Sequence, residues 1–345
     1  MSIQFVHETR PQRVRFGSGG AATALSAEFT LLGITRAMVI TTASATAAAD
    51  RITAGLPVVL RYRDVAMHVP VEVAERARSA AAAHDVDALV SIGGGSATGL
   101  AKAVALTTGL PVVAVPTTYA GSEATDVWGL TEGARKTTGT DPRVLPRAIV
   151  YDAELTTSLP VAMSVASGVN ALAHCVDSMW APRTDPIDQA LAVEGMRALR
   201  TGLPMVVADP AGLTGREHTL YAAYLAAVAF ASAGAGLHHK ICHVLGGMFG
   251  LPHAPTHAVV LPHVLAFNGP AAPEAARRVA DAVGGPLPAL LDSLEAPKAL
   301  RDFGFAESDI PSAVEAVLPA VPPGNPRPVT AEDVTALLHA AWQGR

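Results

Sequence analysis

The sequence predicts two domains of different class: an α/β domain with a parallel, Rossmann-like sheet over residues 1–158, and an all-α domain over residues 159–345. Up to about residue 116, short apolar runs alternate with helical segments, which is typical of a parallel sheet covered on both faces. Beyond about Pro160 strand patterns cease and long Ala/Leu-rich stretches take over. At 345 residues, the chain is long enough for each domain to bury its own core.

The elements expected from these patterns follow in chain order. Buried strands are expected at residues 36–42, 57–60, 87–92 and 111–116, with helices at 21–32, 72–84 and from the glycine-rich turn to residue 106. In the second domain, helices are expected at 186–200, 217–232 and 273–282. The last helix follows a Pro/Gly-rich loop and begins with the capping-box pattern Thr330-Ala331-Glu332-Asp333.

Composition excludes several classes of protein. A net charge of −5 provides no basic footprint for nucleic acid, and two cysteines, Cys175 and Cys242, do not suggest a disulfide framework. The N-terminus lacks a signal-peptide pattern. Residues 220–237 contain no charged side chain, but they are mostly Ala, so we interpret them as a buried core helix and not a membrane span. We therefore expect a cytoplasmic protein with no membrane or nucleic-acid partner.

Two polar loops indicate a nucleotide site. The first follows the third expected strand and opens a helix, where glycines let the backbone approach a pyrophosphate. It is neither a G-x-G-x-x-G fingerprint nor a Walker A loop. The second follows the next strand, and adjacent parallel strands end at the same edge of a sheet. The candidate cofactor residues in these loops are Gly93, Gly94, Gly95, Ser96, Thr117, Thr118 and Ser122.

The end of the first expected strand bears on the choice of cofactor. It reads Thr41-Thr42-Ala43-Ser44, and no carboxylate follows until Asp50. Without an acidic partner for a ribose hydroxyl there is little repulsion of a 2′-phosphate, so both NADH and NADPH are expected to be used. Thr41 joins the candidate cofactor residues.

Polar residues repeat at helical spacing in the second half. His239 and His243 are four apart, as are Asn170 and His174, so each pair projects from one helix face. Two such pairs could hold a divalent metal, for which imidazole is a usual ligand. However, the Asn170 amide brings no charge, and the pattern therefore indicates a metal-site scaffold without its metal. We interpret His238, His257 and His263 as structural, and both cysteines as buried apolar residues.

These motifs together resemble the iron-containing alcohol dehydrogenase family, over essentially the whole chain. The resemblance rests on the GGGS turn, the loop Thr117-Thr118-Tyr119-Ala120-Gly121-Ser122-Glu123, the helix Gly168–His174 and the later histidines, in this order. It implies the dehydroquinate synthase-like fold, a nicotinamide cofactor on the first domain and a substrate cleft between domains. Metal-bearing members use one Asp and three His, at positions that here are Asn170, His174, His239 and His253, with His243 lining the cleft.

Three departures resemble one branch, the maleylacetate reductases, which work without added metal. They are Asn170 in place of Asp, Gly99 where an Asp is usual, and the short threonine loop. This implies NADH- or NADPH-dependent reduction of the C=C bond of maleylacetate to 3-oxoadipate in aromatic compound catabolism, by a homodimer that requires no metal. The implied catalytic residues are His243 and His253, with His239 and His174. The implied partners of the dicarboxylate substrate are Asn170, Tyr119, Lys240 and Arg135, and Lys136 lies near the cofactor.

Three alternatives remain open at this point. A metal-dependent alcohol or glycerol dehydrogenase would need metal for activity and would reduce NAD with a simple alcohol. A lyase like dehydroquinate synthase would retain NAD through its cycle, with no net turnover. A non-catalytic sensor would bind NADH and convert nothing.

Overall fold

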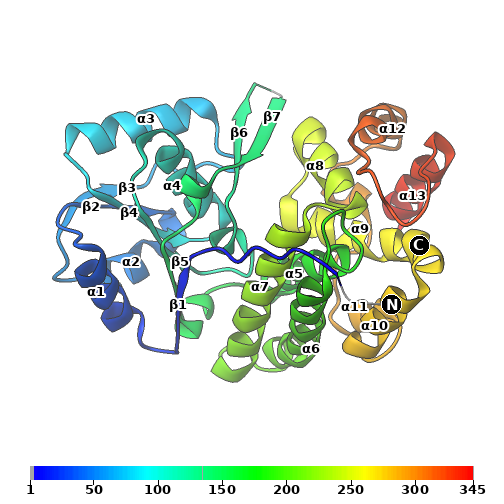
Figure 1. Ribbon diagram of the computed structural model, residues 1–345, viewed down its shortest axis with the longest axis horizontal. Coiled ribbons are helices and arrows are strands. Elements are labelled where there is room, and N and C mark those ends of the chain that lie inside the picture. The colour runs from blue at the N-terminus through cyan, green and yellow to red at the C-terminus, as the bar shows by residue number, and fades with distance from the viewer. Residues whose placement is uncertain (1–3, 134, 345) are drawn as a thin grey trace. The chain divides into compact units, whose positions relative to one another are not determined.

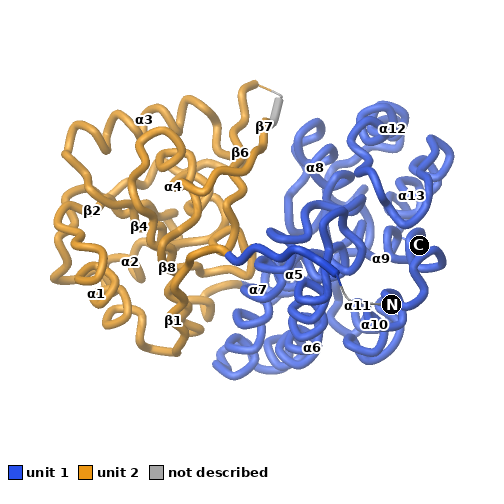
Figure 2. Tube along the Cα trace, in the orientation of Figure 1, with its two compact units in different colours: residues 1–9, 160–345 blue, residues 10–159 orange. Residues whose placement is uncertain are grey.

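The computed structural model describes residues 4–133 and 135–344, without the side chains of residues 135 and 136. The chain forms two compact units (Figure 2). Residues 10–159 make an α/β unit, and residues 160–344, together with residues 4–9, make a helical unit. The second unit begins where strand patterns cease in the sequence.

A sheet of six parallel strands forms the centre of the α/β unit, in the order β1-β8-β5-β4-β2-β3 (Figure 1). Its strands are β1 (Arg13–Phe16), β2 (Ala37–Thr41), β3 (Val58–Tyr62), β4 (Ala88–Gly93), β5 (Val112–Pro116) and β8 (Ala148–Tyr151). The four strands expected from the sequence are confirmed as β2 to β5. β2, β4 and β5 are largely apolar and fully buried because both faces of the sheet are covered, whereas β3 at the edge of the sheet is only partly buried and contains Arg61.

Helices pack on both faces of this sheet. They are α1 (Ala21–Leu32), α2 (Thr46–Ile52), α3 (Val71–Ala83) and α4 (Gly95–Thr108). Along β2, Val39 packs with α1 and α2 in one apolar core, whereas Met38 and Ile40 pack with α3 and α4 in another. Successive side chains of a strand point to opposite faces, so one apolar strand serves both cores.

Four strands were not anticipated. β1 and β8 have only four residues each, and β1 alternates Arg with apolar residues. The other two form a separate antiparallel hairpin, β6 (Val127–Glu132) and β7 (Arg135–Thr140), of which β7 is polar. β1 and β7 lack the apolar run by which buried strands are recognised, whereas β8 has such a run and was overlooked because it is only four residues long.

Helices make up the second unit (Figure 1). They are α5 (Val161–Ser178), α6 (Pro186–Ala208), α7 (Leu213–Ala233), α8 (Leu237–Phe249), α9 (His253–Asn268), α10 (Pro273–Val283), α11 (Leu287–Ser293), α12 (Ile310–Val317) and α13 (Ala331–Gln343). α5 packs against α6, α7 and α9, and α8, α9, α12 and α13 share an apolar core. The expected capping box is confirmed: Thr330 and Asp333 bond reciprocally at the start of α13.

The interpretation of residues 220–237 as one helix is wrong. α7 ends at Ala233, Gly234 has φ 89°, and α8 begins at Leu237 after a bend of 99°. A positive φ is accessible to glycine without the steric penalty of a Cβ, so Gly234 ends the helix. In the described part of the chain no single helix is long and apolar enough to cross a membrane. The bent pair of α7 and α8, taken together, has the length and the composition of a membrane span.

Candidate active site

The predicted nucleotide loops lie at one edge of the sheet. Gly93 at the end of β4 pairs with Pro116 at the end of β5, and Thr41 at the end of β2 pairs with Ile92. Because these strands are parallel neighbours, the residues that follow them also lie close together. The Thr117 N–H donates to the Gly93 carbonyl at 3.0 Å.

The glycines of this edge have specific steric roles. Gly93 has φ 152°, and a Cβ on Gly94 would lie 2.9 Å from Cγ2 of Thr118. A Cβ on Gly95 would make only an ordinary contact. Gly94 is the N-cap of α4, whose first turn has N–H groups with no partner inside the helix. The turn is therefore a close-packed backbone cradle at a helix N-terminus, which suits a phosphate group.

A buried lysine that sequence reasoning missed holds the loop after β5. Nζ of Lys102, on α4, donates to the carbonyls of Ser122, Thr125 and Val127 at 2.5–2.9 Å, and to Oγ1 of Thr125 at 3.0 Å. Burial lowers the pKa of Lys102 to about 7. The signal was its position within an otherwise apolar helix, where a lysine needs a buried partner.

Other predicted residues of the α/β unit have varied positions. Tyr119 is fully buried. Lys136 lies on β7 opposite Thr131, but its side chain and that of Arg135 fall outside the described residues.

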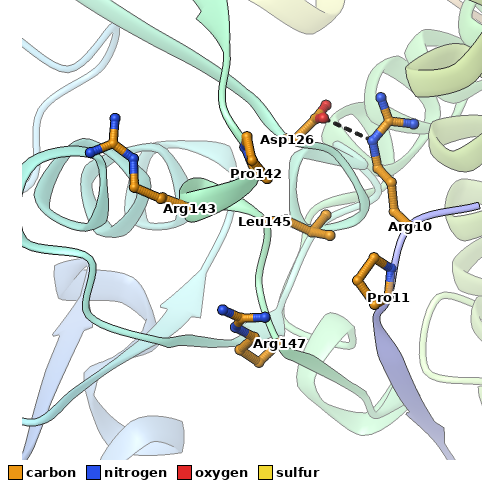
Figure 3. Close-up of a pocket in the computed structure, with 7 residues that line it drawn as sticks. All are labelled: Arg10, Pro11, Asp126, Pro142, Arg143, Leu145 and Arg147. Carbon is orange, nitrogen blue, oxygen red and sulfur yellow. Dashed lines mark hydrogen bonds and ion pairs between the residues drawn. The ribbon is translucent and has the colours of Figure 1, made fainter.

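A cavity of about 280 Å³ (Figure 3) is lined by none of the predicted site residues. Arg147 in its wall directly precedes β8, so this cavity is at the opposite edge of the sheet from the glycine turn.

Three helices of the helical unit bring polar side chains together into one group, here called the histidine cluster. Its members are His174 from α5, His238, His239 and His243 from α8, and His253 and His257 from α9; Asn170 lies one turn before His174 on α5. The ring of His239 stacks on His174 at 4.9 Å between centroids and lies 6.1 Å from His243. The predicted helical spacing of His239 and His243 is therefore confirmed, and both join His174 in one group.

His257 is the member that sequence reasoning undervalued. Its ring lies 4.3 Å from that of His253 and 4.9 Å from those of His238 and His239, measured between centroids. It is fully buried, and Nδ1 is 2.9 Å from Nε2 of His238. The available signal was the i, i+4 spacing of His253 and His257. His263, by contrast, has no ring contact with the cluster among those the structure gives.

Asp177 was also missed, although it lies three residues after His174 on the same helix. Its Oδ2 accepts hydrogen bonds from Nδ1 of His239 at 2.7 Å, from the Gly236 N–H at 3.0 Å and from the His239 N–H at 3.3 Å. Burial raises the pKa of Asp177 to about 7, and the backbone donors oppose that rise. With its proton on Nδ1, the neutral His239 ring presents the bare Nε2 lone pair.

Burial keeps the deep part of the cluster uncharged. It lowers the pKa of His174 to about 4 and that of His238 to about 3, and it holds the pKa values of His239 and His257 well below their usual range. His253 is exposed and His243 is partly buried. The cluster therefore combines neutral buried rings with two rings that water can reach.

Two family models match most of the chain. The model described as iron-containing alcohol dehydrogenase matches residues 11–153, and that of the C-terminal part of the Fe-containing alcohol dehydrogenase family matches residues 164–342. The chain belongs to the iron-containing alcohol dehydrogenase family. This confirms the resemblance drawn from the motifs, and the fold of the family is the one described above.

Individual members of this family are similar over almost the full length. A maleylacetate reductase of Sphingobium indicum is 44% identical, covering 99% of this chain and 98% of the relative. The crystal structure of maleylacetate reductase from Agrobacterium tumefaciens has a TM-score of 0.93 at 41% identity and covers 99% of both chains. That of an iron-containing alcohol dehydrogenase from Corynebacterium glutamicum has a TM-score of 0.97 at 56% identity, covering 100% of this chain and 98% of the other.

The family name implies iron, so the donor set must be tested for it. Within the described residues, Oδ1 of Asn170, Nδ1 of His174 and Nε2 of His239 are buried without a hydrogen-bond partner. These three residues and His253 stand at the positions that the family resemblance assigns to the metal, and all four side chains are neutral donors. A divalent ion there would have no anionic ligand to compensate for its lost hydration. These four residues therefore do not fit a resident iron, whereas a set of ligands that includes a carboxylate would.

Proposed function

We propose that the protein uses NADH or NADPH to reduce the C=C bond of maleylacetate, giving 3-oxoadipate in aromatic compound catabolism. The observation that supports this most is the set of residues itself: histidines in the family's order, with an amide, Asn170, in place of a carboxylate. Relatives with the name maleylacetate reductase at 41–47% identity add to it. The proposed cofactor residues are the glycine turn, Thr41, Thr117, Thr118, Ser122 and Lys136.

The substrate chemistry suits a site without a metal. Maleylacetate has a ketone conjugated to the alkene, so a hydride from the nicotinamide can add to the carbon β to the ketone. Negative charge then develops on the ketone oxygen, and a proton is needed at the α carbon. A simple carbonyl would require a metal for polarisation. An enone is already activated, and positioned hydrogen-bond donors supply the remaining stabilisation. We therefore propose that no metal is required.

The state of His239 narrows the choice of proton donor. Its Nδ1–H is engaged by Asp177, so Nε2 can accept a hydrogen bond but cannot donate one. The proposed donors to the enolate oxygen or the α carbon are therefore His243 and His253, which are the cluster's more exposed rings. Because they are within reach of water, they can regain a proton after each turnover. His174 and His239 then shape the site.

The two substrate carboxylates require donors or cations. Lys240, Asn170 and Tyr119 are the proposed partners. Of these, Lys240 is the most accessible to a substrate, because Asn170 and Tyr119 are buried.

We also propose that the protein is a homodimer, which light scattering of the purified protein would test.

A metal-dependent alcohol dehydrogenase is the second candidate. The unpartnered Oδ1 of Asn170 and Nε2 of His239 favour it, as does the similarity to the Corynebacterium glutamicum protein. It predicts that a simple alcohol reduces NAD only when metal is present.

One experiment separates the two candidates. Oxidation of NADH and of NADPH is followed with EDTA-treated protein and maleylacetate, then repeated after addition of Zn²⁺ or Fe²⁺. Full activity without metal is expected. Activity that appears only on adding metal would overturn the metal-free proposal and direct the search to alcohols and aldehydes. Failure with maleylacetate under both conditions would overturn the proposed substrate.

A further inference from the structure

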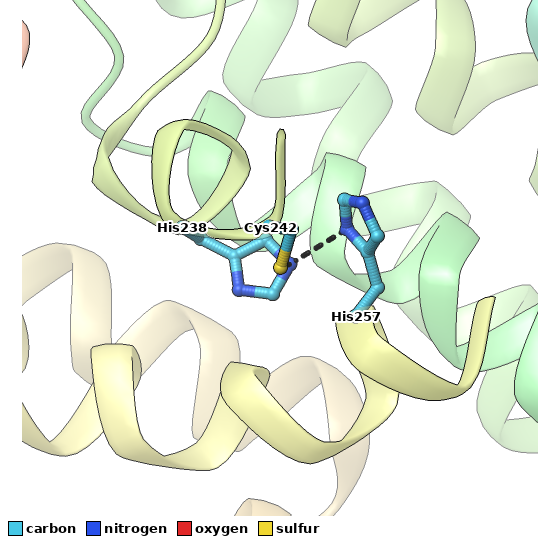
Figure 4. A group of neighbouring side chains, drawn as sticks. All are labelled: His238, Cys242 and His257. Atoms are coloured by element: carbon cyan, nitrogen blue, oxygen red, sulfur yellow. Dashed lines mark hydrogen bonds between the residues drawn. The ribbon is translucent and has the colours of Figure 1, made fainter. Parts of the chain in front are cut away.

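Two members of the histidine cluster and a cysteine form a separate group of donor atoms that the proposed function does not use. His238, Cys242 and His257 come from α8 and α9, and Figure 4 shows their side chains converging. Nε2 of His238 is 2.9 Å from Nδ1 of His257 and 3.7 Å from Sγ of Cys242, and one donor atom from each residue lies within 4.8 Å of the others. All three side chains are at least 98% buried.

This spacing is close to that of a tetrahedral zinc site. With Zn–N distances of about 2.0–2.1 Å and a Zn–S distance of about 2.3 Å, two nitrogens lie roughly 3.3 Å apart and nitrogen and sulfur roughly 3.6 Å apart. The two rings would need to separate by a few tenths of an ångström, replacing their mutual hydrogen bond with bonds to the ion. The proton of that hydrogen bond moves to the other nitrogen of the ring that carries it, so both coordinating nitrogens are free of hydrogen. Imidazole nitrogen and thiolate sulfur are the ligands that Zn²⁺ prefers.

Charge distinguishes this trio from the neighbouring Asn170 set. Cys242 can become an anionic ligand by losing its proton to solvent as the ion binds. Burial and the nearby Asp177 raise the pKa of the Cys242 thiol, so the thiol keeps its proton until an ion takes its place. The Asn170 set offers only neutral donors, so an ion that enters the cluster is stabilised better beside Cys242.

We propose that His238, Cys242 and His257 form a binding site for Zn²⁺, which releases one proton from the Cys242 thiol as it binds. The fourth position is left to water or to a neighbouring donor. The His257 ring contacts both His239 and His253, so an ion that fixes His257 also changes the site beside it. Zn²⁺ bound here therefore inhibits the enzyme and is not a cofactor. The inhibition rests on the proposed function, whereas the binding does not.

Cobalt substitution tests the binding directly. Co²⁺ bound by a thiolate has a near-ultraviolet charge-transfer band, which a site of nitrogen and oxygen donors lacks. The metal-free protein is titrated with Co²⁺, and Zn²⁺ is then added in competition. We expect the band in the wild-type protein and in Cys175→Ser, a matched change at the other buried cysteine, and its loss in Cys242→Ser. Zn²⁺ affinity should fall at least about tenfold in Cys242→Ser.

Absence of the band in the wild-type protein, or its persistence in Cys242→Ser, would overturn the proposal. This test does not require any of the variants to be enzymatically active.

Inhibition of NADH oxidation by Zn²⁺ is measured separately. The proposal expects Zn²⁺ inhibition in the wild-type protein and in Cys175→Ser, and at least about tenfold weaker inhibition in Cys242→Ser. Equal inhibition of all three proteins would overturn the inhibitory role. If maleylacetate is not a substrate, the cobalt result is unaffected.

Discussion

Replacing Asp177 with Ala removes the acceptor that fixes His239. Three N–H groups converge on its Oδ2, from the Gly236 backbone, the His239 backbone and the His239 ring. A buried donor left without a partner costs about 1–3 kcal/mol, so the variant, with three such donors, should lose at least roughly 3 kcal/mol of unfolding free energy. Without the carboxylate, the His239 proton distributes between Nδ1 and Nε2. The resulting misplacement of His239 in the site should lower the rate by up to about 100-fold.

The conservative change Asp177→Asn provides the contrast. Because all three donors meet one oxygen, an amide oxygen in its place can accept the same bonds, although without charge assistance. We expect Asn to retain most of the rate. Nitrogen NMR of the histidines should show Nδ1-protonated His239 in the wild-type and Asn proteins, and a mixture in Ala.

Asp152 supplies the control. It is buried and accepts hydrogen bonds from the backbone N–H groups of Gly19, Ala21 and Glu154, but it belongs to the α/β unit and bonds no histidine. Asp152→Ala should lose comparable stability while keeping its rate per folded molecule. The role of Asp177 in positioning His239 would be refuted if Asp177→Ala kept the wild-type rate per folded molecule. It would also be refuted if Asp177→Ala and Asp152→Ala lowered that rate by the same factor.

Four further predictions follow from the described contacts. Gly94→Ala puts a methyl group 2.9 Å from Thr118, so KM for NADH should rise about tenfold or more while thermal stability changes little; an unchanged KM would remove the glycine turn from the cofactor site. Lys102→Met leaves buried carbonyls unpaired and should cost about 3 kcal/mol in chemical denaturation, and a neutral result would contradict its structural role. Asn170→Asp supplies an anion and should raise Zn²⁺ affinity more than about tenfold in calorimetry; unchanged affinity would show that the missing carboxylate is not what weakens this site. Because burial lowers the folded pKa of His174 to about 4, His174 by itself should lower stability by about 1.4 kcal/mol per pH unit as the pH falls from 6.5 to 4; the wild-type protein should therefore lose stability more steeply than His174→Phe by this amount in chemical denaturation, and equal slopes would contradict this.

The sequence by itself determined the elements that have a strong local signal. The buried strands β2, β4 and β5 are largely apolar runs, and the start of α13 is a local exchange of hydrogen bonds between Thr330 and Asp333. The pairing of His239 with His243 is likewise a property of one helix. β1 and β7 escaped notice because short or polar strands depend on their partners for stability, which no local pattern records. β8 does have an apolar pattern, but a run of four residues does not separate a strand from other buried segments.

Only the tertiary structure decided which histidines act together. The residues next to His257 in the sequence do not distinguish it from a structural histidine of a protein core. Its contact with His238 and His239 exists because α9 packs against α8. Asp177 reaches His239 for the same kind of reason, since Gly236 at the start of α8 lets the backbone approach the carboxylate: a Cβ there would lie 2.4 Å from Oδ1. Spacing along one helix is fixed by its 3.6-residue period, whereas contacts between helices depend on how their side chains pack, and this depends on residues throughout the chain.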